Sequence, residues 1–240
     1  MNSTFLRPIL KPHLELQEDY YLVLKLNTQS LFIMDINYKA LQELIATDSP
    51  TGFTHHAAEY CMQYLRDLGY SPQLTQKGAV TCSLGEQPTL SIAGHIDTLG
   101  AIVSAIKPDG TLQISLLNGL SLNMAEGEYC RIHTQDEKIY TGTLLLNNPS
   151  VHANNKVSTI ERTIESMHIR IDEVVKTKED VTKLGIAVGD IIAFDTRYQE
   201  LPSGFIKSRY LDNKAGCLVL FEIAQRAKAS ADLAHWKAEA

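Results

Sequence analysis

Two segments between Met34 and Gly69 carry hydrophobic residues at helical spacing. The first follows Asp35, which we expect to cap a helix N-terminus, and repeats apolar residues every three or four positions as far as Ile45. The second begins at Thr54, another candidate cap, and ends at Gly69, a residue type common after helix C-termini. The sequence therefore predicts two amphipathic helices. The apolar positions that keep this period are Tyr38, Leu41, Leu44 and Ile45 in the first helix and Ala57, Ala58, Cys61, Met62, Leu65 and Leu68 in the second.

The middle of the chain, residues 104–200, is made mainly of short apolar runs separated by turn residues, a pattern typical of β structure. One helix is predicted to interrupt it at Lys178–Leu184, where Thr177 and Asp180 suit a variant capping box. The predicted strands of this region and of the segment before it are Val80–Leu84, Thr89–Ala93, Ile102–Ile106, Leu112–Leu116, Tyr129–Thr134, Ile139–Leu145 and Ile191–Phe194.

A long amphipathic helix is predicted from Lys214 to about Ala229, with Ala215, Leu218, Val219, Ile223 and Ala227 facing inward. Helices and strands thus alternate at both ends of the chain around a β-rich middle. This order predicts an α/β fold in which an α/β domain, residues 34–103 and 201–240, is interrupted by an inserted β domain, residues 104–200. Residues 1–33 show no clear period, and we expect them to be an extra N-terminal segment.

Composition narrows the class of protein. The 240 residues are 44% hydrophobic and 21% charged, which is ordinary for a globular protein. The net charge of −6 argues against nucleic acid or an anionic membrane as a partner. The four cysteines are scattered, which suits reduced thiols, and no apolar run is long enough to span a bilayer or act as a secretory signal. We therefore expect a cytoplasmic protein.

The candidate chemistry lies in two loops, Gly94–Gly100 and Arg209–Gly216. On a strand, His95 and Asp97 would share a face, so both side chains can point into one pocket. An imidazole is a good zinc ligand, and a carboxylate beside it can orient the ring. We expect the flanking glycines, Gly94 and Gly100, to let the backbone approach a bound ion.

Each loop also has a simpler interpretation. A His-x-Asp pattern arises often by chance, and Asp212 also has the position of a cap for the helix that follows it. Lys214 and Arg209 can be ordinary solvated charges. Among the other histidines, His55 and His56 are expected at the surface near a helix start, and His133 and His168 are expected to face solvent. We interpret His152 as structural, with a smaller chance of contact with a site.

Four separated motifs together resemble the glutamyl-aminopeptidase-like metallopeptidases, which include deblocking and tetrahedral aminopeptidases and some proteins named endoglucanase. The resemblance is closest to members found in bacterial osmoprotectant gene clusters. It covers roughly Met34 to Lys228. The motifs are Gly94–Gly100, the turn Ser49–Gly52 before a helix, Leu184–Asp190, and Ser208–Gly216.

The resemblance implies a role for each site residue. His95 matches the ligand of one metal, Asp212 the carboxylate that bridges two metals, and Asp97 the residue that supports the site from behind the histidine. Two divalent ions, zinc, cobalt or manganese, would activate a water for attack on the N-terminal bond of a peptide substrate. The inserted β domain resembles the part through which these enzymes form homo-oligomers.

The sequence also departs from the family pattern. The paired glutamates and the final histidine that the family places after the long helix have no counterpart before Ala240. We therefore expect an inactive, C-terminally truncated fragment whose catalytic half exposes apolar surface. Two other functions stay open: a non-catalytic relative that self-associates through the inserted β domain, and a deacylase of N-acyl amino acids.

Overall fold

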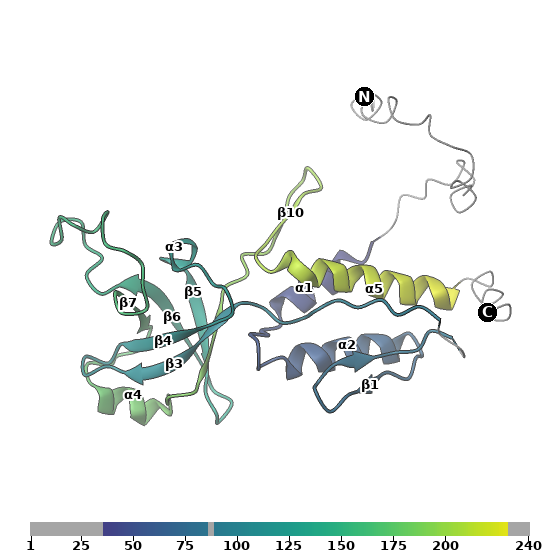
Figure 1. Ribbon diagram of the computed structural model, residues 1–240, viewed down its shortest axis with the longest axis horizontal. Coiled ribbons are helices and arrows are strands. Elements are labelled where there is room, and N and C mark those ends of the chain that lie inside the picture. The colour runs from purple at the N-terminus through teal and green to yellow at the C-terminus, as the bar shows by residue number, and fades with distance from the viewer. Residues whose placement is uncertain (1–35, 86–88, 230–240) are drawn as a thin grey trace. The chain divides into compact units, whose positions relative to one another are not determined.

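The computed structural model describes residues 36–85 and 89–229, and Asn37 begins the compact unit to which every element below belongs (Figure 1). The segment 1–33 that we expected to be extra, the residue Asp35 that we expected to be a cap, and the tail after Ala229 lie outside the described residues. No helix in this described part is both long and apolar enough to cross a membrane.

Three helices form one part of the unit: α1 (Tyr38–Ala46), α2 (His55–Asp67) and α5 (Leu211–Ala229). Both predicted N-terminal helices are therefore confirmed. The N-terminus of α1 is capped by Asn37, whose side chain accepts a hydrogen bond from the Ala40 N–H at 3.2 Å. The cap expected at Thr54 forms no side-chain hydrogen bond. The three helices bury one apolar face against each other, and the rings of Tyr64 and Phe221 stack at 4.2 Å.

The β-rich middle forms a closed, antiparallel barrel in the order β3-β4-β7-β6-β5-β8 (Figure 1). Its strands are β3 (Gly100–Ile106), β4 (Leu112–Leu117), β5 (Tyr129–His133), β6 (Ile139–Leu146), β7 (Met167–Ile171) and β8 (Ile191–Phe194). Both predicted hairpins and the predicted strand at Ile191–Phe194 are confirmed, whereas β7 was not predicted. The inward-facing apolar residues of the strands form the core of the closed barrel and are almost fully buried. They include Val103, Ile114, Ile132, Leu144, Ile169 and Ile192.

Two short helices accompany the barrel, α3 (Leu122–Ala125) and α4 (Lys178–Leu184). The predicted capping box of α4 is present, since the Thr177 side chain accepts from the Asp180 N–H and Asp180 accepts from the Thr177 N–H. The remaining strands are short pairs: β1 (Gln73–Leu74) with β2 (Val80–Thr81), and β9 (Gln199–Glu200) with β10 (Ile206–Lys207).

The strand predicted at Thr89–Ala93 is wrong, and Val80–Leu84 is a strand only at Val80–Thr81. A strand needs a neighbour to share its backbone hydrogen bonds. Within residues 89–99 the only β pairing is the isolated bridge of Thr98 to Pro50. Leu90 is consequently 76% exposed.

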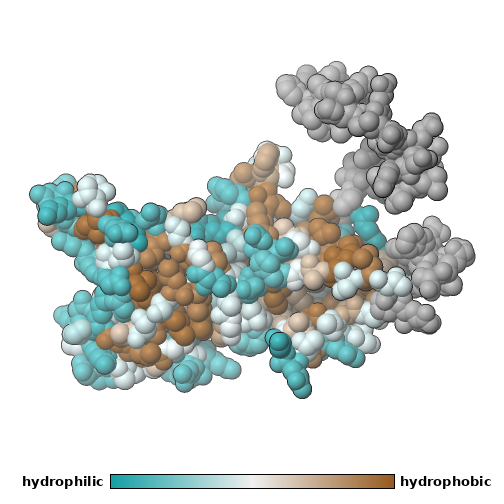
Figure 2. Space-filling view, in the orientation of Figure 1, coloured by the Kyte–Doolittle hydropathy of each residue, from teal (hydrophilic) through white to brown (hydrophobic). Residues whose placement is uncertain are grey.

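The inward face predicted for the last helix is wrong at two positions. Val219 is 56% exposed and Ile223 is also exposed, whereas Cys217, Phe221 and Ala224 are buried. The reason is that α5 packs on α1 and α2, which cover only part of its apolar circumference. The expected exposed apolar surface is therefore present, and Figure 2 shows brown, apolar residues among the polar ones on the face in view.

Candidate functional site

The structure brings together the three predicted site residues, although one of them is far from the others in sequence. The distance from His95 Nδ1 to Asp97 Oδ1 is 3.1 Å, and that from His95 Nε2 to Asp212 Oδ1 is 3.3 Å. The imidazole thus has a carboxylate at each ring nitrogen. Asp97 is half-buried, whereas the Asp212 side chain is 92% exposed, so the Asp212 side of the ring is the open side.

The turn Ser49–Gly52 holds the segment that carries His95 and Asp97. The Thr98 N–H donates to the Ser49 carbonyl at 2.8 Å, and the Thr51 N–H donates to the Thr98 carbonyl at 3.2 Å. The Ser49 hydroxyl donates to the Ile96 carbonyl at 2.7 Å, and Ser49 is fully buried. These bonds fix the backbone on both sides of Asp97.

Two polar side chains that we did not predict surround the Asp97 carboxylate. The Thr51 hydroxyl donates to Asp97 Oδ2 at 2.6 Å, and Asn118 Nδ2 donates to the same oxygen at 3.4 Å and also to Thr51 Oγ1. Thr51 belongs to a motif that the sequence singled out as a turn. Asn118 follows β4 in the barrel, and no sequence pattern connected it with His95.

Asp212 does not act as a simple helix cap. The backbone of both Asp212 and Asn213 is non-helical, and the regular part of α5 begins at Lys214. Among the described residues, the carboxylate of Asp212 has His95 as its partner. The simpler interpretation is therefore wrong for this residue.

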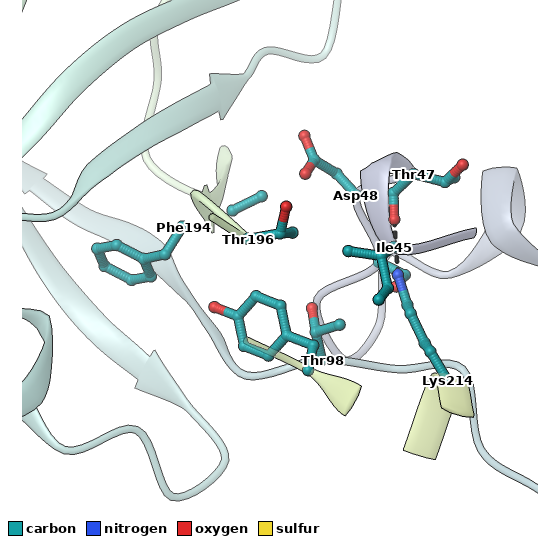
Figure 3. Close-up of a pocket in the computed structure, with 10 residues that line it drawn as sticks. Ile45, Thr47, Asp48, Thr98, Phe194, Thr196 and Lys214 are labelled. Carbon is teal, nitrogen blue, oxygen red and sulfur yellow. Dashed lines mark hydrogen bonds between the residues drawn. The ribbon is translucent and has the colours of Figure 1, made fainter. Parts of the chain in front are cut away.

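Lys214 and Arg209 are not solvated charges either. Lys214 is 1% exposed, and its ammonium donates to the carbonyls of Leu44 and Thr47 at 2.8 Å each. Burial lowers the pKa of Lys214 to about 8. Figure 3 shows Lys214 reaching the C-terminal end of α1 at a narrow pocket. Lys214 lies two residues after Asp212. Its hydrogen bonds to α1 therefore help to fix the position at which the loop 209–216 passes into the regular part of α5.

Arg209 fastens the other side of this loop to the barrel. Its guanidinium donates to the carboxylate of Glu128 at 2.9 Å and to the carbonyl of Met124 at 2.6 Å. Glu128 is buried and also pairs with Arg197 at 2.7 Å. The loop that carries Asp212 is thus held between α1 and the barrel.

The expected role of the two glycines is not supported by the packing around them. A side chain at Gly100 would lie 2.7 Å from Pro50 Cβ and 2.8 Å from the Ile192 carbonyl oxygen. A side chain at Gly94 would lie 3.2 Å from Cys217 Sγ and 3.3 Å from Asn213 Oδ1. Both glycines therefore serve close packing between segments of the chain.

The other histidines differ in their surroundings. His55 and His56 are exposed at the start of α2, as expected, and their rings lie 3.9 Å apart. His133 was wrongly expected in solvent: its side chain is 11% exposed, and Nε2 lies 2.8 Å from Asp48 Oδ2. His168 is partly buried beside Asn147, and burial lowers its pKa. His152 is exposed in the loop after β6.

Two atoms of the kind that ligate metals, His95 Nε2 and Asp212 Oδ1, face each other at the open side of His95. In a tetrahedral site with ligand bonds of about 2.1 Å, two ligand atoms are about 3.4 Å apart. The 3.3 Å between His95 Nε2 and Asp212 Oδ1 matches that separation. Residues 36–85 and 89–229 contain no group of three or more histidine, cysteine or acidic side chains placed to hold a metal. The described part therefore contributes a pair of ligand candidates.

Comparison with known proteins places the chain in a family. The family model of M42 glutamyl aminopeptidase matches residues 78–236, which is more than half of the chain. A Bacillus subtilis (strain 168) protein named aminopeptidase YhfE is 41% identical over 186 residues, which cover 76% of this chain and 54% of that protein. The chain thus spans about half of the length of this relative.

Two solved structures share the fold. The TET aminopeptidase of the marine sediment archaeon Thaumarchaeota archaeon SCGC AB-539-E09 superposes with a TM-score of 0.70 at 22% identity, covering 80% of this chain and 54% of that one. The TET1 peptidase of Pyrococcus horikoshii gives 0.67 at 19% identity, with 81% and 56% covered. The α/β fold class with a barrel-like sheet is confirmed, and the chain belongs to the M42 glutamyl aminopeptidase family.

Proposed function

We propose that this chain carries part of the active site of a two-metal aminopeptidase. The observation that supports the proposal most directly is the position of His95 between two carboxylates, Asp97 at Nδ1 and Asp212 at Nε2. In this proposal His95 is a ligand of one metal, Asp212 bridges both metals, and Asp97 orients His95. Membership of a family of peptidases supports the same reaction class.

The side chains present have separate tasks in this proposal. Asp97 accepts the Nδ1 proton of His95 and leaves the electron pair of Nε2 free toward Asp212. Asp212 adds negative charge at the open side of the ring. Divalent ions, when bound, would lower the pKa of a water and polarise the scissile carbonyl. The exposed side of Asp212 would face a peptide substrate held by its free N-terminus.

The proposal also predicts weak metal binding. A catalytic zinc usually has three protein ligands, whereas the described residues bring two ligand candidates together. The general base and the remaining ligands would come from sequence outside the described part. Residues 1–240 alone should then bind zinc, cobalt or manganese weakly and hydrolyse little peptide.

Homo-oligomer formation is the second part of the proposal. The Pyrococcus horikoshii relative is described as assembling into a tetrahedron or an octahedral shell. The closed barrel has a complete core of its own and gives a rigid surface for such contacts. Self-association without catalysis, or deacylation of N-acyl amino acids, would be the function if the aminopeptidase proposal fails.

Metal titration of the purified chain tests the site. Isothermal titration with Zn²⁺, Co²⁺ and Mn²⁺ should show binding that Asp212→Ala weakens at least about tenfold, since a ligand is lost. The matched control is Asp67→Ala, an exposed aspartate at the end of α2. Equal affinity of the wild-type and Asp212→Ala chains would reject Asp212 as a ligand.

Reading the gene past codon 240 separates the functional alternatives. A strand ending in paired glutamates, in frame or after one frameshift, would support the aminopeptidase. Joining that sequence to this chain should then give metal-dependent release of N-terminal residues. Release of acyl groups from N-acyl amino acids instead would favour the deacylase.

A further inference from the structure

We propose that Thr51 and the barrel residue Asn118 are positioning residues for His95. Acting through the Asp97 carboxylate, they keep the imidazole proton on Nδ1 and the electron pair on Nε2, facing Asp212. The inference rests on the proposed function for its purpose, because a metal ligand needs that electron pair. The hydrogen bonds that support the inference are present in the chain without metal.

The two oxygens of Asp97 are divided between two partners. Oδ1 lies 3.1 Å from His95 Nδ1, and Oδ2 accepts the Thr51 hydroxyl at 2.6 Å. A hydrogen bond to a carboxylate is charge-assisted and stronger than one between neutral groups. It therefore resists rotation of the carboxylate and keeps Oδ1 directed at the ring.

The polarity of this chain of hydrogen bonds follows from the donors available. Thr51 has one hydroxyl proton and two acceptors within reach, Asp97 Oδ2 at 2.6 Å and the Thr98 carbonyl at 3.5 Å. The shorter, charge-assisted contact takes the proton, so Thr51 donates to Asp97. Thr51 Oγ1 must then accept from Asn118, whose Nδ2 also lies 3.4 Å from Asp97 Oδ2. The Asn118 amide nitrogen faces two acceptors, which fixes the orientation of its side chain. The donors therefore converge on Asp97 from both sides. Asn118 donates to Thr51, Thr51 donates to Asp97 Oδ2, and His95 Nδ1–H donates to Asp97 Oδ1.

Both positioning residues are held independently of His95. The Thr51 backbone is bonded to Thr98 on the segment that carries the site. Asn118 has a φ of +61°, a left-handed conformation that asparagine tolerates better than most residues. Because Asn118 follows β4, the barrel supplies a side chain to the site that the two loops build.

The consequence is a fixed histidine tautomer. A neutral imidazole can carry its proton on either nitrogen, and the hydrogen bond that the ring makes decides which. Each ring nitrogen faces a carboxylate oxygen, at 3.1 Å for Asp97 and 3.3 Å for Asp212. Asp97 is the nearer and the less exposed of the two, so with Asp97 locked we expect Nδ1–H to be the donor and Nε2 to keep its electron pair. If Asp97 could rotate or turn toward water, the tautomers would mix and a metal would bind less well.

Nitrogen-15 NMR of the metal-free chain, well above the ordinary histidine pKa, measures the tautomer directly. Thr51→Val keeps the shape and removes the hydroxyl, Thr51→Ser keeps the hydroxyl, and Asn118→Gly removes the amide while tolerating the positive φ. The matched control is Thr54→Val, because Thr54 makes no side-chain cap bond. We expect Nδ1–H in wild type, Thr51→Ser and Thr54→Val, and a mixture in Thr51→Val and Asn118→Gly.

Metal affinity provides the second measurement. Loss of an outer partner of a metal-bound histidine typically weakens binding about 10–100-fold. Thr51→Val and Asn118→Gly should show such a loss, and Thr51→Ser should not. If the wild-type chain binds no metal, the proposed function fails, while the tautomer still decides the positioning role.

A wild-type tautomer in both Thr51→Val and Asn118→Gly would overturn the inference. If Thr51→Val does not fold, Asn118→Gly and Thr51→Ser still decide it, since only the former lacks a donor in the series. A mixed tautomer in Thr51→Ser would also contradict the proposed role of the hydroxyl.

Discussion

Asp48 shows how a single residue joins the helical part of the unit to the barrel. It follows α1, and its carboxylate receives two hydrogen bonds from Arg131, at 2.6 and 2.7 Å, and lies 2.8 Å from His133. Both partners belong to β5. Burial by itself would raise the pKa of Asp48, but the hydrogen bonds and charges of Arg131 and His133 outweigh it and hold the pKa at about 2.

The lowered pKa predicts a loss of stability in acid. Because the folded pKa lies below the ordinary 3.8, the contribution is complete above about pH 4 and is lost as the pH falls through about 2. It amounts to about 2 kcal/mol. Urea unfolding of wild type and Asp48→Asn across this range should show that the variant loses less stability on acidification. Asp67→Asn, at an exposed position, should show the same pH dependence as wild type. If the unfolding free energy of Asp48→Asn falls with pH as much as that of wild type, Asp48 is not the source of the acid sensitivity.

Gly100 gives a second prediction at the residue scale. Gly100→Ala should destabilise the unit by about 1–3 kcal/mol, because the new methyl would press on Pro50 and the Ile192 carbonyl. Chemical denaturation measures the effect. Gly119→Ala is the control, since a side chain at Gly119 meets no atom within 4 Å. Equal stability of the two variants would show that the turn Ser49–Gly52 can shift to make room for the methyl group.

At the scale of elements, α5 and the segment 89–93 differ from the rest of the fold. Each carries apolar residues at the spacing of its expected structure, and each leaves several of them exposed. The barrel strands bury their inward-facing apolar residues, and the large apolar side chains that they expose, Tyr129 and Ile139, lie at strand ends. Apolar surface that is exposed to water favours association with another protein or another part of the chain.

This contrast between the faces of α5 is testable. Val219→Gln combined with Ile223→Gln should reduce the fluorescence of a bound apolar dye and any self-association, and should change stability by no more than about 0.5 kcal/mol. Leu218→Gln, on the buried face, should instead destabilise strongly. A large loss of stability in the double variant would mean that these side chains are packed.

At the scale of the whole unit, the barrel and the helices are joined by polar contacts. Arg131 pairs with Asp48, and Arg209 and Arg197 pair with Glu128. The barrel nevertheless has its own closed core. We therefore expect these contacts to couple the unfolding of the two parts.

Arg131→Ala should separate their unfolding. Arg131 is 30% exposed and Asp48 10%, so removing the guanidinium from this partly buried pair should cost about 1–3 kcal/mol, and it leaves Asp48 with His133 alone. Calorimetry should show one transition for wild type and an earlier transition of the helical part in the variant. Arg170→Ala is the control, because Arg170 is exposed on β7. A single, equally shifted transition would indicate that the parts stay united by other contacts.

The sequence by itself determined the local elements of this protein. The helices α1, α2 and α4, the two hairpins and the capping box at Thr177 were all predictable, because the residues that form each of them are neighbours in the chain. The residues His95, Asp97 and Asp212 were also identifiable as candidates. The ligand role of His95 and Asp212 and the orienting role of Asp97 remain predictions.

Only the tertiary structure decided which residues meet. It brings Asn118 and Thr51 to Asp97, buries Lys214 and His133, and leaves Val219 exposed. None of these outcomes follows from local periodicity, because burial and hydrogen bonding depend on partners distant in sequence. The physical reason is that a side chain's environment is set by the elements that pack against it, whereas the pattern along the chain reports only which face could be covered.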